Sequence, residues 1–213
     1  MHKKIQKRPE KSPEQKQGFS PMDYKKAANY IFEVGTLKKF AHSGTKLAGI
    51  RHPDTIAEHA YRTAIIGYIL AKAEKVDCEK VLLICILHDN AEARITDLHR
   101  VARRYINSEV AEKKAFHEQT ENLPPDLAQK FSGLFDEYEE KKSPEAIVAR
   151  DADMLETAFQ CKEYLETGYE SCADWLKNVE KCLKTTSAKK MFTSMKKQKF
   201  TDWWQGLKKV DGY

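Results

Sequence analysis

Seven consecutive apolar residues, 81–87, run directly into the dipeptide His88-Asp89. Because no glycine or proline interrupts this run, it predicts a helix that is apolar on every side, and such a helix belongs in a domain core. An imidazole and a carboxylate at its end would then be buried. Burial of both is unfavourable unless the two groups are paired or coordinate a metal. The run therefore indicates a buried polar site whose other members lie elsewhere in the chain.

Helical spacing of apolar residues recurs along the chain, and no strand pattern or repeat interrupts it. We therefore predict an all-α fold: a single helical domain over residues 21–185 with extra C-terminal helices. Residues 1–20 are polar and basic and are expected to form a flexible arm. Residues 186–213 predict a basic, amphipathic C-terminal helix that packs on the domain or on a partner subunit. The expected helices cover residues 21–37, 55–75, 78–89, 108–122, 125–141 and 143–167, with two more between 171 and 213.

Charge is distributed unevenly along the 213 residues. The net charge is +5, but residues 1–17 carry +4 and residues 184–209 carry +7, which leaves −6 for the rest of the chain. This distribution argues against a uniformly basic nucleic-acid-binding face. A content of 41% hydrophobic residues is sufficient for one domain with its own core.

The cysteines and the lengths of the apolar runs indicate the cellular compartment. The five cysteines form no C-x-x-C pair and are odd in number, which favours a reduced, cytoplasmic protein. No apolar run approaches the roughly 18–20 residues that span a bilayer. The basic N-terminus has no apolar segment behind it, so no signal peptide is expected.

Three predicted helices carry candidate metal ligands. His59 follows Ile56 by three residues and precedes Thr63 by four, which places it on or beside the buried face of its helix. The helix over 143–167 carries Asp151 and Asp153. We interpret Asp151 as part of a solvated surface with Arg150, and we favour Asp153 for function. Together with His88-Asp89 these residues would form a two-histidine, two-carboxylate site. Mixed ligation of this kind suits Mn, Co, Fe or Mg better than tetrahedral zinc.

The segments that carry these residues resemble the HD-domain family of metal-dependent phosphohydrolases over about residues 37–168. The closer resemblance is to the branch of 5′-deoxynucleotidases. The matching segments are Ile56-Ala57-Glu58-His59, His88-Asp89-Asn90-Ala91-Glu92, Thr96-Asp97-Leu98 and Ala152-Asp153-Met154-Leu155. The last match selects Asp153 over Asp151, which spacing alone does not.

The resemblance implies a divalent metal ion (Mn, Co, Fe, Mg or Zn) bound by His59, His88, Asp89 and Asp153. It also implies two catalytic carboxylates. Glu92, four residues after His88, would orient or deprotonate the nucleophilic water or help to protonate the leaving oxygen. Asp97 would orient water or bind the sugar, and its alternative role is a helix N-cap.

The sequence departs from the family pattern in the loop before the first ligand. Relatives usually carry an arginine there, often near a tryptophan, that contacts the substrate phosphate. The comparable residue here is His42, and no tryptophan follows it in the loop. Substrate binding is therefore assigned to His42 and Arg51, with the Lys38-Lys39 pair as a further source of positive charge.

The predicted function is metal-dependent removal of phosphate from nucleoside 5′-monophosphates, with deoxyribonucleosides as the expected substrates. One alternative keeps the site but changes the nucleotide to a triphosphate, a cyclic dinucleotide or an alarmone, although no glycine-rich loop is present to bind a triphosphate. The other alternative is a non-catalytic, nucleic-acid-binding helical protein. We expect a homodimer, with Trp203-Trp204 as a possible contact, and no membrane partner.

Overall fold

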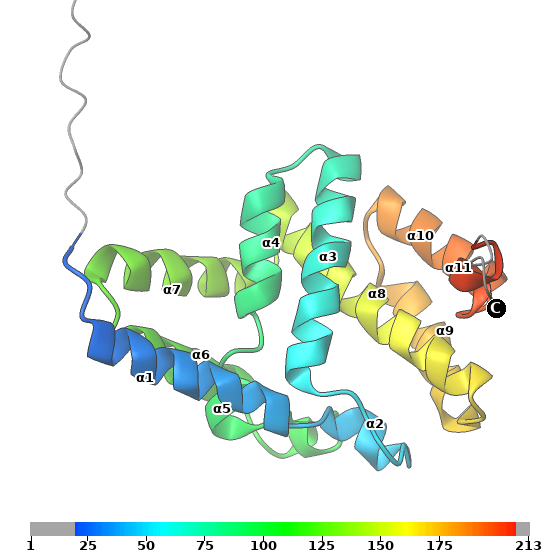
Figure 1. Cartoon of the computed structure of the whole chain (residues 1–213), viewed down its shortest axis with the longest axis horizontal. Helices are drawn as coiled ribbons and strands as arrows, with labels where there is room; N and C mark the ends of the chain where they lie inside the picture. The colour runs from blue at the N-terminus through cyan, green and yellow to red at the C-terminus, as the bar shows by residue number, and fades with distance from the viewer. Residues whose placement is uncertain (1–19, 208–213) are drawn as a thin grey trace, which may run out of the picture.

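Helices α3 (Ile56–Glu74) and α4 (Cys78–Leu87) form an antiparallel pair, and the long helix α8 (Pro144–Glu166) packs against both (Figure 1). The computed structural model describes residues 20–207. The other helices there are α1 (Tyr24–Val34), α2 (Ser43–Leu47), α5 (Glu92–Ile95), α6 (Ser108–Thr120), α7 (Pro125–Glu140), α9 (Ala173–Cys182), α10 (Thr186–Lys197) and α11 (Asp202–Gln205), with short 3₁₀ helices η1 (Gly35–Lys39), η2 (Ala102–Arg104) and η3 (Glu170–Cys172). Residues 20–207 contain no strand, and the all-α prediction is confirmed.

Local sequence signals set the ends of the helices that carry the site. Thr55 and Glu58 form a reciprocal capping box at the start of α3. The Asp77 side chain caps α4 by accepting from the backbone N–H of Lys80. Helix α8 begins with Ser143 as its cap, followed by a proline at the first helical position. These caps fix where each helix begins and therefore which residues face inward.

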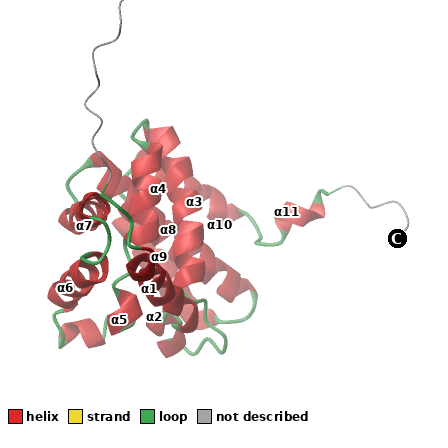
Figure 2. Cartoon of the chain, turned by 60° about the vertical axis from the view of Figure 1, so that its left-hand side comes forward, coloured by secondary structure: helices red, strands yellow, loops and turns green. Residues whose placement is uncertain are grey.

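The main core lies between α3, α4, α7 and α8. Val81, Ile84 and Leu155 are almost completely buried there, and Phe116 of α6 stacks on Phe135 of α7 with ring centroids 4.3 Å apart. Helix α10 extends the same core through residues Ala188, Phe192 and Met195. Helix α11 projects away from the body of the protein (Figure 2).

The structure differs from the sequence-based expectation in three places. The segment 38–53, which lies between two of the expected helices and includes the loop before the first ligand, contains part of η1 and the whole of α2. Helix α4 ends at Leu87, so Glu92 lies in the separate short helix α5 rather than on a continuation of α4. The solvated surface considered for Asp151 is wrong, because this side chain is only 1% exposed.

The predicted N-terminal arm lies outside the described residues, apart from Ser20. The first predicted helix forms as α1, but none of its residues is buried. Within residues 20–207, no helix is both long and apolar enough to cross a bilayer.

Candidate metal centre

The four predicted metal ligands lie together, although they come from three separate helices or helix ends. His59 lies on α3, His88 and Asp89 lie at the end of α4, and Asp153 lies on α8. His59 Nε2 is 3.6 Å from Oδ2 of Asp89 and 3.5 Å from Oδ1 of Asp153. His88 Nε2 is 3.1 Å from Oδ2 of Asp89. Packing of α4 and α8 against α3 thus brings the four donor groups to one point.

Each of the two histidines is oriented by an acceptor at its Nδ1 atom. His59 Nδ1 lies 2.5 Å from Oε2 of Glu156, one turn beyond Asp153 on α8. His88 Nδ1 lies 2.8 Å from the carbonyl oxygen of Cys85. An acceptor at Nδ1 holds a ring proton on that nitrogen, so Nε2 is the nitrogen through which each ring can bind a cation. Both rings therefore present a metal-binding nitrogen to the centre.

Asp153 has its own supporting contacts. The hydroxyl of Tyr138 donates to Oδ2 of Asp153 at 2.9 Å, and Nη1 of Arg150 donates to that hydroxyl at 2.8 Å. Arg150 Nη1 also lies 3.4 Å from Oδ2 of Asp153. These contacts leave the other carboxylate oxygen, Oδ1, facing His59.

Electrostatics keep the two carboxylates of the cluster ionised. Burial alone would raise the pKa of Asp89, but the neighbouring imidazoles of His88 and His59 lower this pKa to about 2. Burial likewise would raise the pKa of Asp153, and contact with His59 and the charge of Arg150 lower it below its usual range. Two buried anionic carboxylates facing two buried imidazoles form a donor set that suits a divalent cation.

The arrangement passes two tests for a metal site that need no ion to be present. First, the Nε2 atom of His88 is buried, and its 3.1 Å contact with Asp89 lacks hydrogen-bond geometry within the described part of the chain, which is unfavourable unless a ligand completes its coordination. Second, ligand atoms about 2.0–2.2 Å from one ion lie about 3.0–3.5 Å from each other. Two of the observed spacings, 3.1 and 3.5 Å, fall within this range, and the third, 3.6 Å, lies just above it.

Glu92 lies beside the cluster in an unusual state for a carboxyl group. It is 5% exposed, and its Oε2 atom has no hydrogen-bond partner among the described residues. Burial raises the pKa of Glu92 well above its usual range, and the charges of Asp89 and Asp97 raise this pKa further. A carboxyl group with a raised pKa can hold a proton near neutral pH and deliver it.

Asp97 caps a helix, but not one that follows it in sequence. Its Oδ2 atom accepts from the backbone N–H of Ser43 at 2.7 Å and from the Ser43 hydroxyl at 3.0 Å. Ser43 is the first residue of α2, directly after His42. Asp97 therefore anchors the segment that carries His42.

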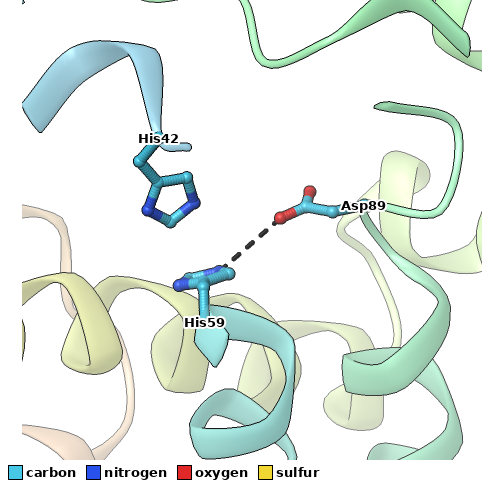
Figure 3. Close-up of side chains that lie close together, drawn as sticks. All are labelled: His42, His59 and Asp89. Carbon is cyan, nitrogen blue, oxygen red and sulfur yellow. Dashed lines mark ion pairs between the residues drawn. The ribbon is translucent and has the colours of Figure 1, made fainter. Parts of the chain in front are cut away.

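The two predicted substrate-binding residues are placed differently. His42 packs against His59 with ring centroids 4.6 Å apart, and Figure 3 shows both rings beside Asp89. Arg51 is exposed and makes no hydrogen bond or ion pair with the residues from 20 to 207. The structure thus brings His42, but not Arg51, into contact with the cluster.

Two residues that support the centre were missed in the sequence. Glu156 is 1% exposed and accepts from His59, while Nε of Arg62 donates to Oε1 of Glu156 at 2.8 Å. The signal available was the spacing His59-x-x-Arg62 on one inner helix and Asp153-x-x-Glu156 on another. Residues three apart share a helix face, so each supporting residue lies one turn from a ligand.

The fold and this cluster define the class of protein. Residues 34–195 match the family model described as HD domain, and the chain belongs to that family. The family resemblance read from the motifs is confirmed. HD domains are metal-dependent, in agreement with the donor cluster.

Curated proteins similar to this chain include several named 5′-deoxynucleotidase. The "5′-deoxynucleotidase HDDC2" of Bos taurus is 28% identical over 134 residues, which cover 62% of this chain and 64% of the relative. The human protein of the same name is 26% identical over 148 residues, covering 68% of this chain and 72% of the relative. The matched region thus spans somewhat less than two thirds of the bovine protein.

Solved structures show the same architecture. A conserved hypothetical protein from Pyrococcus furiosus has a TM-score of 0.69 and 30% identity, and the match covers 80% of this chain and 99% of that protein. The PH0347 protein from Pyrococcus horikoshii has a TM-score of 0.69 and 29% identity, with 80% of this chain and 98% of that protein covered.

Proposed function

We propose that this protein is a metal-dependent phosphohydrolase that removes phosphate from deoxyribonucleoside 5′-monophosphates. The observation that carries the proposal is the convergence of His59, His88, Asp89 and Asp153, with the buried Nε2 atom of His88 facing the carboxylate of Asp89. The names of the curated relatives support the substrate class. The metal ligands in this proposal are those four residues.

The reaction breaks the bond between phosphorus and the 5′ oxygen of the nucleoside. A bound divalent ion would lower the pKa of a water ligand and withdraw charge from the phosphoryl group. The oxygen of water bonds to phosphorus, and the 5′ oxygen leaves with a proton. Glu92 is placed to supply this proton, because burial raises its pKa and its Oε2 atom is uncommitted.

The supporting residues hold the donor atoms in place before substrate arrives. Glu156 keeps the proton of His59 on Nδ1, and Tyr138 with Arg150 turns Oδ1 of Asp153 inward. Asp97 acts through Ser43 on the segment that carries His42, so we assign Asp97 a positioning role beside its proposed catalytic one. Preorganisation of this kind reduces the reorganisation needed during reaction. For Arg51 we propose contact with the substrate phosphate on the basis of the sequence alone.

The test is phosphate release from a panel of ribo- and deoxynucleoside 5′-monophosphates with Mn²⁺, Co²⁺, Mg²⁺ or a chelator. We expect metal-dependent release that is highest with deoxyribonucleotides and lost in Asp89→Asn. Asp174→Asn is the matched control, because this carboxylate is 81% exposed on α9. Release only from a triphosphate, cyclic dinucleotide or alarmone would replace the proposed substrate. Activity that persists in Asp89→Asn would contradict the proposed centre.

We also propose a homodimer in the cytoplasm. Tyr24, Ile31 and Phe32 of α1 are 81%, 68% and 78% exposed, and Trp203 of α11 is 72% exposed. Large exposed apolar side chains on one helix mark an interaction surface. The five unpaired cysteines support a reducing compartment.

The mass in solution tests the homodimer. We expect a dimer for the wild type and a monomer for the double variant Ile31→Lys and Phe32→Ser. The double variant Trp203→Ser and Trp204→Ser tests the C-terminal contact separately. A monomeric wild-type protein would overturn the proposal.

A further inference from the structure

His42 stands at the position where relatives usually carry a phosphate-binding arginine, yet its surroundings resemble those of a metal ligand. Its Nδ1 atom lies 2.9 Å from Oδ2 of Asp54. Oδ1 of Asp54 accepts from the hydroxyl of Tyr164 at 2.8 Å, and the backbone N–H of Asp54 donates to the same hydroxyl at 2.9 Å. The carboxylate that faces His42 is therefore itself held from α8.

The backbone around His42 is fixed on two sides. The N–H of His42 donates to the carbonyl oxygen of Asp54 at 3.0 Å, and the N–H of Ile56 donates to the carbonyl oxygen of Phe40 at 3.0 Å. These bonds flank the bridge between Ala41 and Thr55, directly before the helix that carries His59. His42 therefore has a defined position relative to His59.

Three imidazoles around this point follow the same pattern. Each has an oxygen atom near Nδ1: a carboxylate oxygen of Asp54 at ion-pair distance for His42, a carboxylate oxygen of Glu156 for His59 and the Cys85 carbonyl for His88. A carboxylate or carbonyl at one ring nitrogen is typical of metal-ligating histidines, since it fixes the tautomer and makes the other nitrogen more basic. Figure 3 shows a ring nitrogen of His42 turned towards Asp89, with His59 below it.

We propose that His42 is a further metal ligand through Nε2, which gives this chain three imidazoles and two carboxylates around one ion. Donor atoms of His42, His59 and Asp89 all lie within 4.8 Å of one another, as do those of His59, His88 and Asp153. His59 belongs to both groups, and in the proposal one ion bound by His59 takes ligands from both. The inference rests on the metal centre proposed above.

The alternative is that His42 replaces the arginine and contacts the substrate phosphate. The carboxylate of Asp54 argues against it, because a negative group 2.9 Å from the ring repels a phosphate and offsets the charge of a protonated His42. The same carboxylate strengthens binding to a cation. An added imidazole also shifts the expected metal towards Co²⁺, Fe²⁺ or Zn²⁺ and away from Mg²⁺.

The test measures Co²⁺ affinity of the metal-free, full-length protein by competition with a chromophoric chelator, and records the visible absorption of bound Co²⁺. We expect His42→Ala and His42→Arg each to weaken Co²⁺ binding at least tenfold and to change the absorption bands. His117→Ala is the matched control, because its Nε2 lies 3.2 Å from Asp136, away from the centre. It should bind Co²⁺ like the wild type.

Each negative result has a separate meaning. Equal Co²⁺ binding by wild type and His42→Ala, with a raised KM for the nucleotide in the variant, would overturn the role of His42 as a ligand and favour phosphate contact. Failure of the wild type to bind Co²⁺ would contradict the whole proposed centre. A measurement on the wild type removes dependence on variant folding: with ¹⁵N-labelled histidine, three ring Nε2 signals should shift on addition of Zn²⁺. A shift of only two would overturn the inference.

Discussion

His59 Nδ1 lies 2.5 Å from Oε2 of Glu156, and both residues are 1% exposed. Arg62 binds the other oxygen of the same carboxylate at 2.8 Å through Nε. Glu156 is thereby held between a cation and an imidazole. The contact between His59 and Glu156 thus ties a proposed metal ligand on α3 to a carboxylate on α8 that lies one turn beyond Asp153.

Replacement of Glu156 by glutamine should weaken metal binding without removing a ligand. The neutral amide loses its ion pair with Arg62 and makes His59 Nε2 a weaker donor. Loss of such a supporting carboxylate typically costs about 10–100-fold in metal affinity. Competition with a chelator measures this affinity directly.

Glu163→Gln is the control for that experiment. Glu163 also binds Arg62, through Nη1 at 2.6 Å, but it does not contact His59. The metal affinity of the Glu163→Gln protein should stay within a few-fold of the wild-type affinity. Equal losses in both variants would mean that Arg62, rather than contact with His59, carries the effect.

Glu92→Gln should raise the stability of the metal-free protein but lower the activity of the metal-loaded protein. Because burial raises the pKa of Glu92 in the folded state, the stabilising contribution of its neutral form is complete below the unfolded-state pKa. It is lost as the pH rises through the folded-state pKa. Without metal, the variant should therefore unfold at a higher temperature than the wild type at pH 8. With metal added, its phosphate release should be lower than that of the wild type.

Thermal unfolding from pH 4 to pH 8 with chelator present checks this prediction. The difference between the two proteins should be largest at pH 8 and should shrink towards pH 4. Lower stability of the variant at pH 8 would show that the charged form of Glu92 is stabilised in the fold, and would argue against a proton-donating role.

The helices and the ligand order follow from short-range sequence signals. Thr55 with Glu58, and Ser143 with Pro144, start α3 and α8 as their capping patterns predict. The apolar residues before His88 place α4 in the core. These signals act within one turn of a helix, so a single sequence contains all the information needed to recognise them.

The roles of Asp151 and Asp97 depend on contacts between distant segments. Asp151 binds residues 33 and 34 positions later, and Asp97 binds Ser43 across 54 positions. Helix propensity and spacing do not distinguish Asp151 from Asp153, since both are unfavourable inside a helix for the same reason; only the resemblance to the family motif selects Asp153. The role of Asp151 in joining α8 to the start of α10 becomes visible only in the packed structure.

Gly67→Ala should destabilise the contact between α3 and α4. A Cβ atom at Gly67 would lie 2.6 Å from Sγ of Cys85 and 3.1 Å from Cγ1 of Val81. Overpacking of a core costs about 1–3 kcal/mol in free energy of unfolding. Chemical denaturation measures the loss, and the double variant Gly67→Ala with Cys85→Ala should recover part of it. No recovery would place the strain at Val81.

Asp151→Ala should destabilise the fold more than removal of an ordinary surface carboxylate. The side chain accepts from the backbone N–H groups of Lys184 and Thr185 and from the Thr185 hydroxyl, at 2.6–3.1 Å. These bonds join α8 to the turn that starts α10. Since hydrogen bonds to a charged group contribute about 1.5–3 kcal/mol each and the freed N–H groups regain water only in part, we expect a loss of about 2–4 kcal/mol. Chemical denaturation measures it, with Asp174→Ala as the exposed control. A loss below 1 kcal/mol would mean that water replaces Asp151 at the start of α10.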